Sequence, residues 1–436
     1  MKGLQLEDIK SLPGPDDIGR TILPNGITLL SRCNFNSPSV VLSGYFNAGS
    51  IFDPEDKLGL AYYTAVSLMR GTAKSSFHQI YDALESVGAG LGFSASTLTG
   101  AFSGRSLTED LPLILSLLAE CLQYPAFPTE EIERLRAQFM TGLSIRAQDT
   151  AAMAALKFDE LIFREHPFAR PEDGYPETIT AISSVDLFDY HRKHYGPNGM
   201  VLVLVGAISH PDAVELVQKA LGDWRNPEQE PLPQISTVKP LVNPFRKHIP
   251  LPGKKQTDLI MGVLGPKRAS QDYFAASLGN SILGQFGMMG RIGDVVREQA
   301  GLAYHASTSL NAGIETGTWE VTAGVNPKNL ERAIDLIYSE LNRFIQEPVT
   351  PEELADSKSN YIGRLPLSME SNAGVAAALI NLERFQLGLD YYRRYPSLVN
   401  AVTVEEVLAT ARAFIHPETM IVVSSGPKLV NKRKSK

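Results

Sequence analysis

The sequence predicts an α+β protein with two tandem homologous domains, each an antiparallel-rich sheet covered by helices on one face. Three observations support this class: a long internal repeat, segments that alternate apolar and polar residues, and a proline-rich stretch between the two copies. The chain has 436 residues, 43% of them hydrophobic and 20% charged, which is typical of folded domains and long enough for several.

The repeat is visible in two segments that lie 220 residues apart. "AISSVDLFDYHRKHYGPNGMVLVLVG" ends at Gly206, and "AVTVEEVLATARAFIHPETMIVVSSG" ends at Gly426. Each predicts a helix, a turn at proline and an apolar strand. A second matching pair, helix–turn–helix with acids opening the second helix, begins at Leu111 and at Leu330. A repeat of this length indicates a duplicated domain.

The junction between the copies is the segment 226–247, which contains five prolines. Such a composition predicts a semi-rigid surface linker. We therefore expect an N-terminal domain over 1–232 and a C-terminal domain over 233–436.

The individual elements follow from residue periodicity. In the first half we expect strands over residues 26–33 and 39–50 and helices over 59–72 and 75–87. A hairpin over 93–107 that turns at Gly100 follows, and long helices come after it. In the second half we expect a strand over residues 258–265, a helix that begins at about 271, and two further strands over 304–311 and 317–325. Hairpins with segregated helices favour α+β over a parallel sheet.

Composition excludes several classes of function. A net charge of -7 argues against nucleic acid as the main partner, and no apolar run approaches the ~20 residues of a membrane span. The two cysteines, Cys33 and Cys121, are too few and too far apart for a disulfide framework. The N-terminal residues show no apolar core of a secretory signal, so we expect a cytoplasmic protein.

Two segments carry a family resemblance: "GLAYYTAVSLMRGT" (59–72) and "SILGQFGMMGRIGDVVREQAGLAY" (281–304). With the duplicated plan, they resemble the pitrilysin/insulinase-type zinc metallopeptidases, the inverted zincins. The nearest branch is the small processing-peptidase-like one, which includes mitochondrial processing peptidases and the core proteins of the bc1 complex. The resemblance spans nearly the whole chain and implies a half-clam of two homologous metallopeptidase-like domains.

Active members carry H-x-x-E-H on a helix, where two His at i and i+4 hold Zn²⁺ and the Glu acts as general base. A distant Glu completes the zinc ligands. The resemblance places these four positions at Tyr62, Ala65, Val66 and Leu143. Apolar side chains offer no lone pair and neutral Tyr is not an ordinary zinc ligand, so we expect no metal and no cofactor in this chain. The substrate-carrying edge strand is also altered, with Gly92-Phe93 and Ala95 where the family has Asn-Ala and Thr.

Active members also use an Arg and a Tyr from the second half, and Arg297 and Tyr304 have that spacing in "REQAGLAY". A Tyr hydroxyl can donate to a developing oxyanion, and an Arg can bind peptide carbonyls. The resemblance thus implies a non-catalytic subunit of a heterodimeric zinc endopeptidase, active only with a zinc-bearing homologous partner and acting on peptides. Otherwise, Arg297 caps a helix end and Tyr304 is a half-buried strand residue.

Two other functions stay open. The chain could be a catalytically inert structural or peptide-binding homologue, like the bc1 core proteins, or a self-sufficient peptidase with displaced ligands. The loop Gly284–Gly293 resembles a substrate-sensing loop, although its glycines also suit a turn with positive φ. His191 and His194 have i,i+3 spacing, which we interpret as a solvated helix end rather than a metal site, and we expect His166 to be structural.

Overall fold

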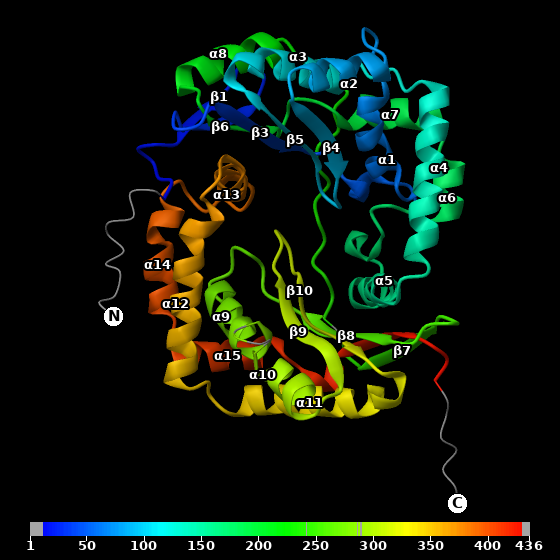
Figure 1. The fold of residues 1–436 in the computed structure, drawn as a ribbon, viewed down its shortest axis with the longest axis vertical. Helices are drawn as coiled ribbons and strands as arrows, with labels where there is room; N and C mark the ends of the chain where they lie inside the picture. The colour runs from blue at the N-terminus through cyan, green and yellow to red at the C-terminus, as the bar shows by residue number, and fades with distance from the viewer. Residues whose placement is uncertain (1–11, 241, 286, 288–289, 430–436) are drawn as a thin grey trace, which may run out of the picture. The chain divides into compact units, whose positions relative to one another are not determined.

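The computed structural model describes residues 12–240, 242–285, 287 and 290–429, shown in Figure 1. The chain forms two compact units. The first unit contains the residues up to Leu143, Arg170–Gln234 and Leu365–Arg394. The second unit contains Ser144–Ala169, Ile235–Arg364 and the residues from Tyr395 on. Each unit therefore takes a segment from the other half of the sequence.

The first unit is built on a six-stranded sheet in the order β1-β2-β6-β3-β5-β4. Only the β2–β6 pair is parallel; the other neighbours are antiparallel. The strands are β1 (Gly19–Ile22), β2 (Thr28–Cys33), β3 (Ser39–Phe46), β4 (Gly90–Ala95), β5 (Gly100–Leu107) and β6 (Val201–Gly206).

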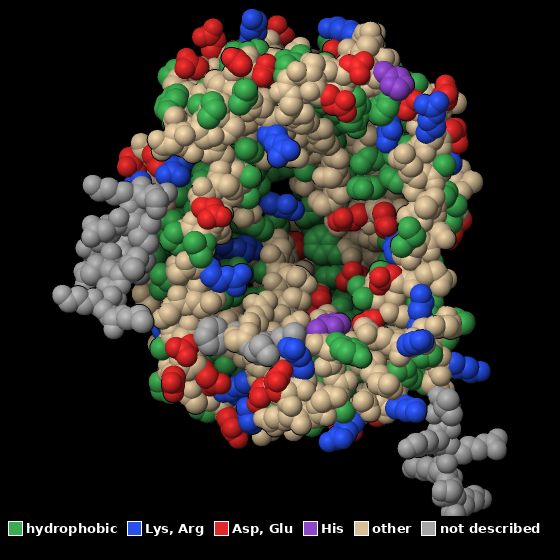
Figure 2. Space-filling model, viewed as in Figure 1, with side chains coloured by type: hydrophobic (Ala, Val, Ile, Leu, Met, Phe, Trp, Pro, Cys, Tyr) green, Lys and Arg blue, Asp and Glu red, His purple; other side chains and the backbone are tan. Residues whose placement is uncertain are grey.

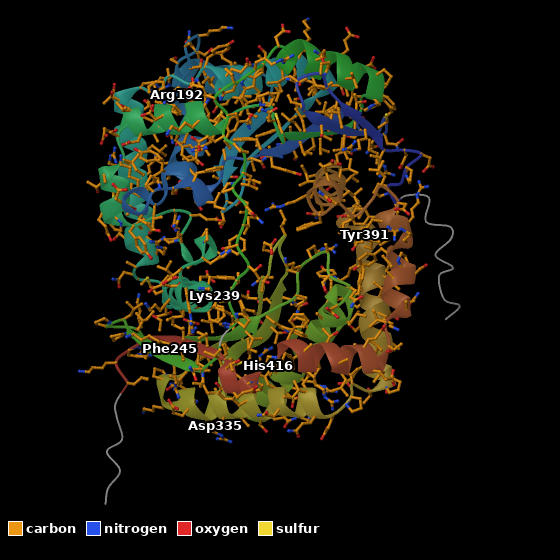
Figure 3. The ribbon with its side chains drawn as sticks, turned by 180° about the vertical axis from the view of Figure 1, so that it is seen from behind. Arg192, Lys239, Phe245, Asp335, Tyr391 and His416 are labelled. Atoms are coloured by element: carbon orange, nitrogen blue, oxygen red, sulfur yellow. The ribbon has the colours of Figure 1, made fainter. Side chains whose placement is uncertain are left out.

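The second unit repeats this plan in a five-stranded sheet with the order β7-β11-β8-β10-β9. The pair β7–β11 is parallel, as β2–β6 is, and β11 and β6 end at Gly426 and Gly206. This equivalence confirms the predicted duplication. The strands are β7 (Phe245–Pro250, its first residue labelled in Figure 3), β8 (Thr257–Leu264), β9 (Ala303–Asn311), β10 (Thr318–Val325) and β11 (Ile421–Gly426).

Helices cover both sheets. Those of the first unit are α1 (Leu60–Ser67), α2 (Phe77–Ser86), α3 (Leu111–Gln123), α4 (Thr129–Arg146, whose last residues enter the second unit), α6 (Pro176–Ala181), α7 (Ser184–His194), α8 (His210–Leu221) and α13 (Asn372–Arg384). Those of the second unit are α5 (Thr150–Phe163), α9 (Tyr273–Gly284), α10 (Gly290–Gly293), a π-helical turn (Asp294–Gln299), α11 (Leu330–Gln346) and α15 (Val404–Phe414). Besides α4, two helices contain residues of both units: α12 (Pro351–Ser368) and α14 (Tyr391–Ala401).

The repeated helices begin with the same local chemistry. A capping box pairs Ser183 with Asp186 at the start of α7, and another pairs Thr403 with Glu406 at the start of α15. In both, the hydroxyl accepts the third backbone N–H while the carboxylate accepts the N–H of the capping residue. The 220-residue repeat therefore includes the signals that start the helices.

The helices on one face of each sheet enclose the main cores. Along β3, Val40, Leu42 and Phe46 point into the first core, which α1, α3 and α8 share. In the second unit, Leu259, Met261 and Val263 of β8 point into a core shared with α9, α11 and α15. The alternation of inward and outward residues matches the two-residue period of a strand.

The opposite face of each sheet carries a helix from the other half of the sequence. Helix α13 packs on β6 and β3 of the first sheet, on the side away from α3 and α8 (Figure 1), and α5 packs on β8 and β11 of the second sheet. The expectation that helices cover one face only is therefore incomplete. These contacts depend on long-range exchange of helices, which local periodicity does not encode.

The surface carries charges of both signs. Figure 2 shows Lys and Arg side chains intermingled with Asp and Glu over the visible face, in keeping with the modest net charge of -7. None of the helices that the structure describes is both long and apolar enough to cross a bilayer.

Candidate functional site

The motif helix α1 begins at a buried carboxylate that the sequence analysis missed. Asp53 is 3% exposed and accepts hydrogen bonds from the backbone N–H groups of Gly59 and Ala61, both at 2.9 Å. Burial raises the pKa of Asp53 to about 7, against the opposing effect of these hydrogen bonds. Asp53 stands six residues before Gly59, outside the usual spacing of a helix cap, so no local pattern reveals it.

The four positions that hold the metal machinery in active relatives form an apolar seam between α1 and α4. Tyr62 and Val66 are partly buried, Ala65 is fully buried and Leu143 is buried. The Tyr62 ring lies 5.5 Å from the ring of Phe139, one helical turn before Leu143. The side chains of Ala65, Val66 and Leu143 offer no lone pair, and neutral Tyr62 is not an ordinary zinc ligand, so these residues do not fit a zinc site.

No alternative metal centre is found within the described residues, where no group of three or more His, Cys, Asp or Glu side chains is arranged to hold an ion. That the purified chain lacks zinc stays a prediction.

Tyr63 of α1 and Arg136 of α4 contact each other and fix the position of α1 against α4. The Tyr63 hydroxyl donates to the Ile132 carbonyl at 2.6 Å, and burial raises the Tyr63 pKa to about 12. The Arg136 guanidinium lies 5.5 Å from the Tyr63 ring and donates to the Ile182 carbonyl at 2.7 Å. Helix α1 is thereby locked to α4, so Tyr62 and Val66 have a fixed direction.

Strand β4 borders α1 and forms an edge of the first sheet. Its one partner strand among the described residues is β5. Phe93 and Ala95 are both 8% exposed and point into the core, while a Cβ added at Gly90 or Gly92 would meet no atom within 4 Å. One face of β4 is therefore open, and its outer backbone groups have no strand partner.

In the second unit, Tyr304 stands on the edge strand β9 with 81% of its surface exposed. The alternative in which it is half-buried is wrong. Arg297 lies in the preceding π-helical turn, partly exposed, with its Nε 3.5 Å from a carboxylate oxygen of Glu298. The turn packs against β9, and π-helical turns occur often at functional positions.

The chain before this turn is anchored by Arg291, which the sequence analysis did not single out. Its guanidinium makes two hydrogen bonds of 2.7 and 2.6 Å to Glu353 of α12 and lies 5.7 Å from the Phe344 ring. In the Gly284–Gly293 loop, Gly287 and Gly290 have φ of 62° and 63°, which suits the turn interpretation. Phe286, Met288 and Met289 of that loop lie outside the described residues.

The histidines are structural. His191 and His194 lie near the C-terminal end of α7, on either side of Arg192, which is labelled in Figure 3. Burial lowers the pKa of both imidazoles to about 4. His191 Nε2 lies 2.8 Å from the Leu122 carbonyl, and the His194 ring stacks on Phe52 at 4.0 Å. The predicted solvated helix end is therefore wrong, because α7 packs this face into the core. His166 is buried, with Nε2 3.0 Å from the Ser236 carbonyl.

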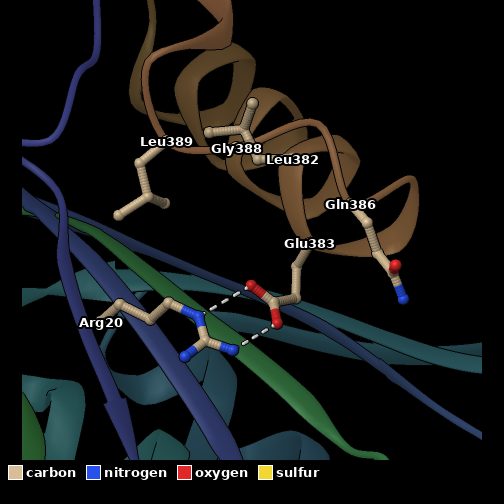
Figure 4. Close-up of a pocket in the computed structure, with 6 residues that line it drawn as sticks. All are labelled: Arg20, Leu382, Glu383, Gln386, Gly388 and Leu389. Carbon is tan, nitrogen blue, oxygen red and sulfur yellow. Dashed lines mark hydrogen bonds and ion pairs between the residues drawn. The ribbon is translucent and has the colours of Figure 1, made fainter. Parts of the chain in front are cut away.

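A further pocket of the first unit lies where α13 ends above β1 (Figure 4). Arg20 donates two hydrogen bonds, 3.0 and 2.7 Å, to the Glu383 carboxylate, while Gln386 points away from the pair. The cavity measures about 340 Å³. Since the two charges neutralise each other, the pair mainly attaches the exchanged helix to the sheet.

Comparisons with known proteins agree with this architecture. Residues 29–166 match the family model described as insulinase (peptidase family M16), and residues 181–361 match the model described as peptidase M16 inactive domain. The chain belongs to the insulinase family of peptidases. The family resemblance inferred from 59–72 and 281–304 is thereby confirmed.

Relatives within the insulinase family include named peptidases and subunits of complexes. An uncharacterized zinc protease of Streptomyces coelicolor is 25% identical over 84% of this chain and 80% of its own. Mitochondrial-processing peptidase subunit beta of Saccharomyces cerevisiae is 25% identical over 81% and 79%. Cytochrome b-c1 complex subunit 1 of Mus musculus is 26% identical over 61% and 55%.

Solved structures show the same fold. A peptidase M16 inactive domain from Pseudomonas fluorescens superposes with a TM-score of 0.88 at 26% identity, covering 95% of this chain and 99% of that one. A protease from Helicobacter pylori superposes with a TM-score of 0.87 at 17% identity, covering 95% and 100%. The predicted α+β class with two homologous domains is confirmed.

Proposed function

We propose that this chain is the non-catalytic subunit of a two-chain zinc endopeptidase. A homologous partner with an intact H-x-x-E-H motif would bind the zinc, and this chain would supply Arg297, Tyr304 and half of a peptide-holding chamber. The domain boundary near residue 232 and a cytoplasmic location belong to the same proposal.

One observation carries the proposal: Tyr304 is 81% exposed on an edge strand, whereas the metal positions of the same chain are apolar and packed. An aromatic side chain exposed to this extent loses the free energy that burial would contribute. Its hydroxyl has no hydrogen-bond partner among the described residues, so it is available to a ligand. Two of the relatives are by name subunits of larger assemblies, which supports a partner chain.

Each residue has a chemical role in this proposal. The Tyr304 hydroxyl would donate a hydrogen bond to the oxygen that becomes negative when the substrate carbonyl is attacked. Arg297, whose contact with Glu298 is long at 3.5 Å, can turn toward the carbonyl oxygens of a peptide. The zinc of the partner would supply the activated water.

The existence of the partner is tested by purification of the tagged chain from its native host. We expect a homologous chain with H-x-x-E-H to copurify in a stable amount, and the pair to cleave an unfolded peptide that neither chain cleaves alone. Recovery of the chain without such a homologue would contradict the proposal.

The role of Tyr304 is tested in the reconstituted pair. Tyr304→Phe removes one donor and keeps the ring, and loss of such a donor costs about 10²–10³ in kcat. Assembly should not change, because one exposed hydroxyl is small against a subunit interface. Tyr124→Phe is a matched control, since Tyr124 is also exposed, at 51%. Cleavage by Tyr304→Phe at the wild-type rate would refute the shared site.

A catalytically inert structural or peptide-binding role is the second candidate. It is favoured by the apolar residues at the metal positions and by the similarity to cytochrome b-c1 complex subunit 1. It predicts assembly without peptide cleavage, so the same reconstitution separates the two candidates.

A further inference from the structure

We propose that a cavity between α3 and α8 of the first unit binds a zwitterionic dipeptide with large apolar side chains. We call this cavity the α3–α8 groove. It measures about 540 Å³, which lies within the range of about 300–1,000 Å³ that is usual for small-molecule sites. All of its lining residues belong to the first unit, so the inference does not rest on the proposed function or on a partner chain.

The floor of the groove is apolar and continuous with the first core. Leu115 and Ala119 are one helical turn apart on α3, and Leu216 and Ala220 are one turn apart on α8. All four belong to the core cluster or pack against it. The two alanines leave space between the helices that longer side chains would fill. An apolar ligand therefore gains free energy by burying its surface on this floor.

Trp224 adds one hydrogen-bond donor to this floor. Its side chain lines the groove and the residue is only 7% exposed. No acceptor for its indole N–H lies among the described residues, and the nitrogen is not one of the fully enclosed unpaired atoms, so a ligand in the groove can reach it. An indole nitrogen only donates, and a largely buried donor without an acceptor costs free energy. This group points to a ligand oxygen, either a carboxylate or a peptide carbonyl.

Four charged side chains stand at the rims of the groove. Lys74 and Glu120 lie on the α3 side, and Lys219 and Asp223 lie on the α8 side. Within the part of the chain that the structure describes, none of the four forms an ion pair. The charges of each rim sum to zero, so a ligand with a single charge meets a repelling group as well as an attracting one. A ligand that carries one charge of each sign matches the groove better.

The contacts of the rim residues indicate how such a ligand lies. Thr72 donates a hydrogen bond to Oε1 of Glu120, which fixes this carboxylate and leaves Oε2 without a described partner. The ammonium group of Lys74 lies 5.7 Å from the centre of the Tyr124 ring, which holds it beside an aromatic face. Glu120 is therefore the acceptor for a ligand ammonium group. Lys219, on the helix that precedes the indole donor, receives the ligand carboxylate.

The distance between the rims sets the length of the ligand. Two packed helices lie about 8–10 Å apart, and α3 packs against α8. A dipeptide is about 7 Å long when extended, so its two charged ends reach one rim each, whereas the charges of a single amino acid lie too close together. Its two side chains then lie over the apolar floor.

The test measures binding of the dipeptide Leu-Phe to the full chain by isothermal titration calorimetry. N-acetyl-Leu-Phe lacks the ammonium group and Leu-Phe amide lacks the carboxylate, and each should bind about tenfold more weakly, as expected when one charge-assisted hydrogen bond is lost. Gly-Gly, which has both charges and no apolar side chain, should not bind measurably. In a Trp319→Phe background, Trp224 is the only tryptophan, so Leu-Phe should also change the intrinsic fluorescence.

Two variants locate the binding site. Glu120→Gln keeps an oxygen for Thr72 but removes the charge, so it should weaken Leu-Phe binding about tenfold and abolish the difference from N-acetyl-Leu-Phe. Lys219→Gln should do the same for the difference from Leu-Phe amide. Glu85→Gln and Lys255→Gln change exposed residues outside the groove and should leave the dissociation constant unchanged. Circular dichroism checks that each variant is folded.

Three results would overturn the inference: no binding of Leu-Phe at millimolar concentration, equal binding of the blocked and free dipeptides, or full binding by Glu120→Gln and Lys219→Gln. Peptide cleavage by the reconstituted pair is a separate measurement. The groove inference and the proposed function can therefore fail independently.

Discussion

The exchange of helices between the sequence halves predicts that Phe158 stabilises the second unit, although it lies in the first half of the chain. Its ring is 1% exposed and packs with Ile260 of β8 and with Ile421 and Val423 of β11. The ring also lies against Gly262, where an added Cβ would come within 2.6 Å of it. Phe158→Ala therefore removes a large buried side chain from a closely packed contact, at a cost of about 3–5 kcal/mol.

The two tryptophans allow each unit to be followed separately. Trp224 is buried in the first unit and Trp319 in the second, and the chain contains no others. In a Trp224→Phe background, urea unfolding monitored by fluorescence reports the second unit. With an m value of roughly 2–3 kcal/mol/M, the loss of about 3–5 kcal/mol lowers the midpoint by about 1–2.5 M. In a Trp319→Phe background, the first-unit transition should move much less.

Two further variants sharpen this prediction. Phe35→Ala is the matched control, because Phe35 is 69% exposed, and it should change either midpoint by little. Gly262→Ala should destabilise the second unit by about 1–3 kcal/mol through overpacking, and by less when Phe158 is already Ala. If Phe158→Ala lowered the Trp224 transition and spared the Trp319 transition, α5 would belong to the first unit and the exchange argument would be refuted.

Three other outcomes are expected. Elemental analysis after dialysis should find no stoichiometric zinc, since Tyr62, Ala65, Val66 and Leu143 offer no ligand set; about one Zn²⁺ per chain would overturn this reasoning. Because burial lowers the folded-state pKa of His191 from 6.5 to about 4, the unfolded chain binds this proton first, so the contribution of His191 to stability is full above pH 6.5 and falls as pH drops toward 4. His194, whose pKa burial also lowers to about 4, acts in the same direction, whereas the pKa of Asp53, raised to about 7, acts in the opposite direction. The prediction is therefore a difference: in urea unfolding with the Trp224 reporter, the wild type should lose up to about 3 kcal/mol more than His191→Gln between pH 6.5 and 4. Gln386 follows the C-terminal end of α13 with a positive φ of 52°, and the next residue, Leu387, donates its backbone N–H to the Leu382 carbonyl at 3.0 Å. Because glycine adopts a positive φ without steric cost, Gln386→Gly should raise the free energy of unfolding by about 0.5–1 kcal/mol, whereas Gln386→Ala should not. Urea unfolding measures both variants.

Much of the fold could be predicted because its signals are local. The apolar run before Gly206 and its copy before Gly426 indicate strands, and the hydroxyl–carboxylate pairs at Ser183 and Thr403 indicate where helices begin. The predicted hairpin over 93–107 exists, although its turn spans 96–99 rather than Gly100, because β5 already begins at that glycine. A one-dimensional pattern locates such an element to within a few residues.

The candidate site divides in the same way. The residue types at Tyr62, Ala65, Val66 and Leu143 follow from the sequence, and so does their inability to bind zinc. Their packing into one seam required the structure, because it depends on contact between α1 and α4. The exposure of Tyr304 was likewise decided by the position of β9 at the edge of its sheet.

The sequence by itself determined the duplication, the identity of most elements and the loss of the metal ligands, since each depends on residues that are near neighbours in the chain or on their type. The tertiary structure alone decided that α5 packs on the sheet of the second unit and α13 on the sheet of the first unit. It also decided that the Asp53 carboxylate accepts the backbone N–H groups at the start of α1. It further decided that His194 is buried, that His191 is partly buried, and that both are neutral rather than solvated. The physical reason is common to all of these: burial and partner choice are set by contacts between distant segments, whose free energy no local periodicity records.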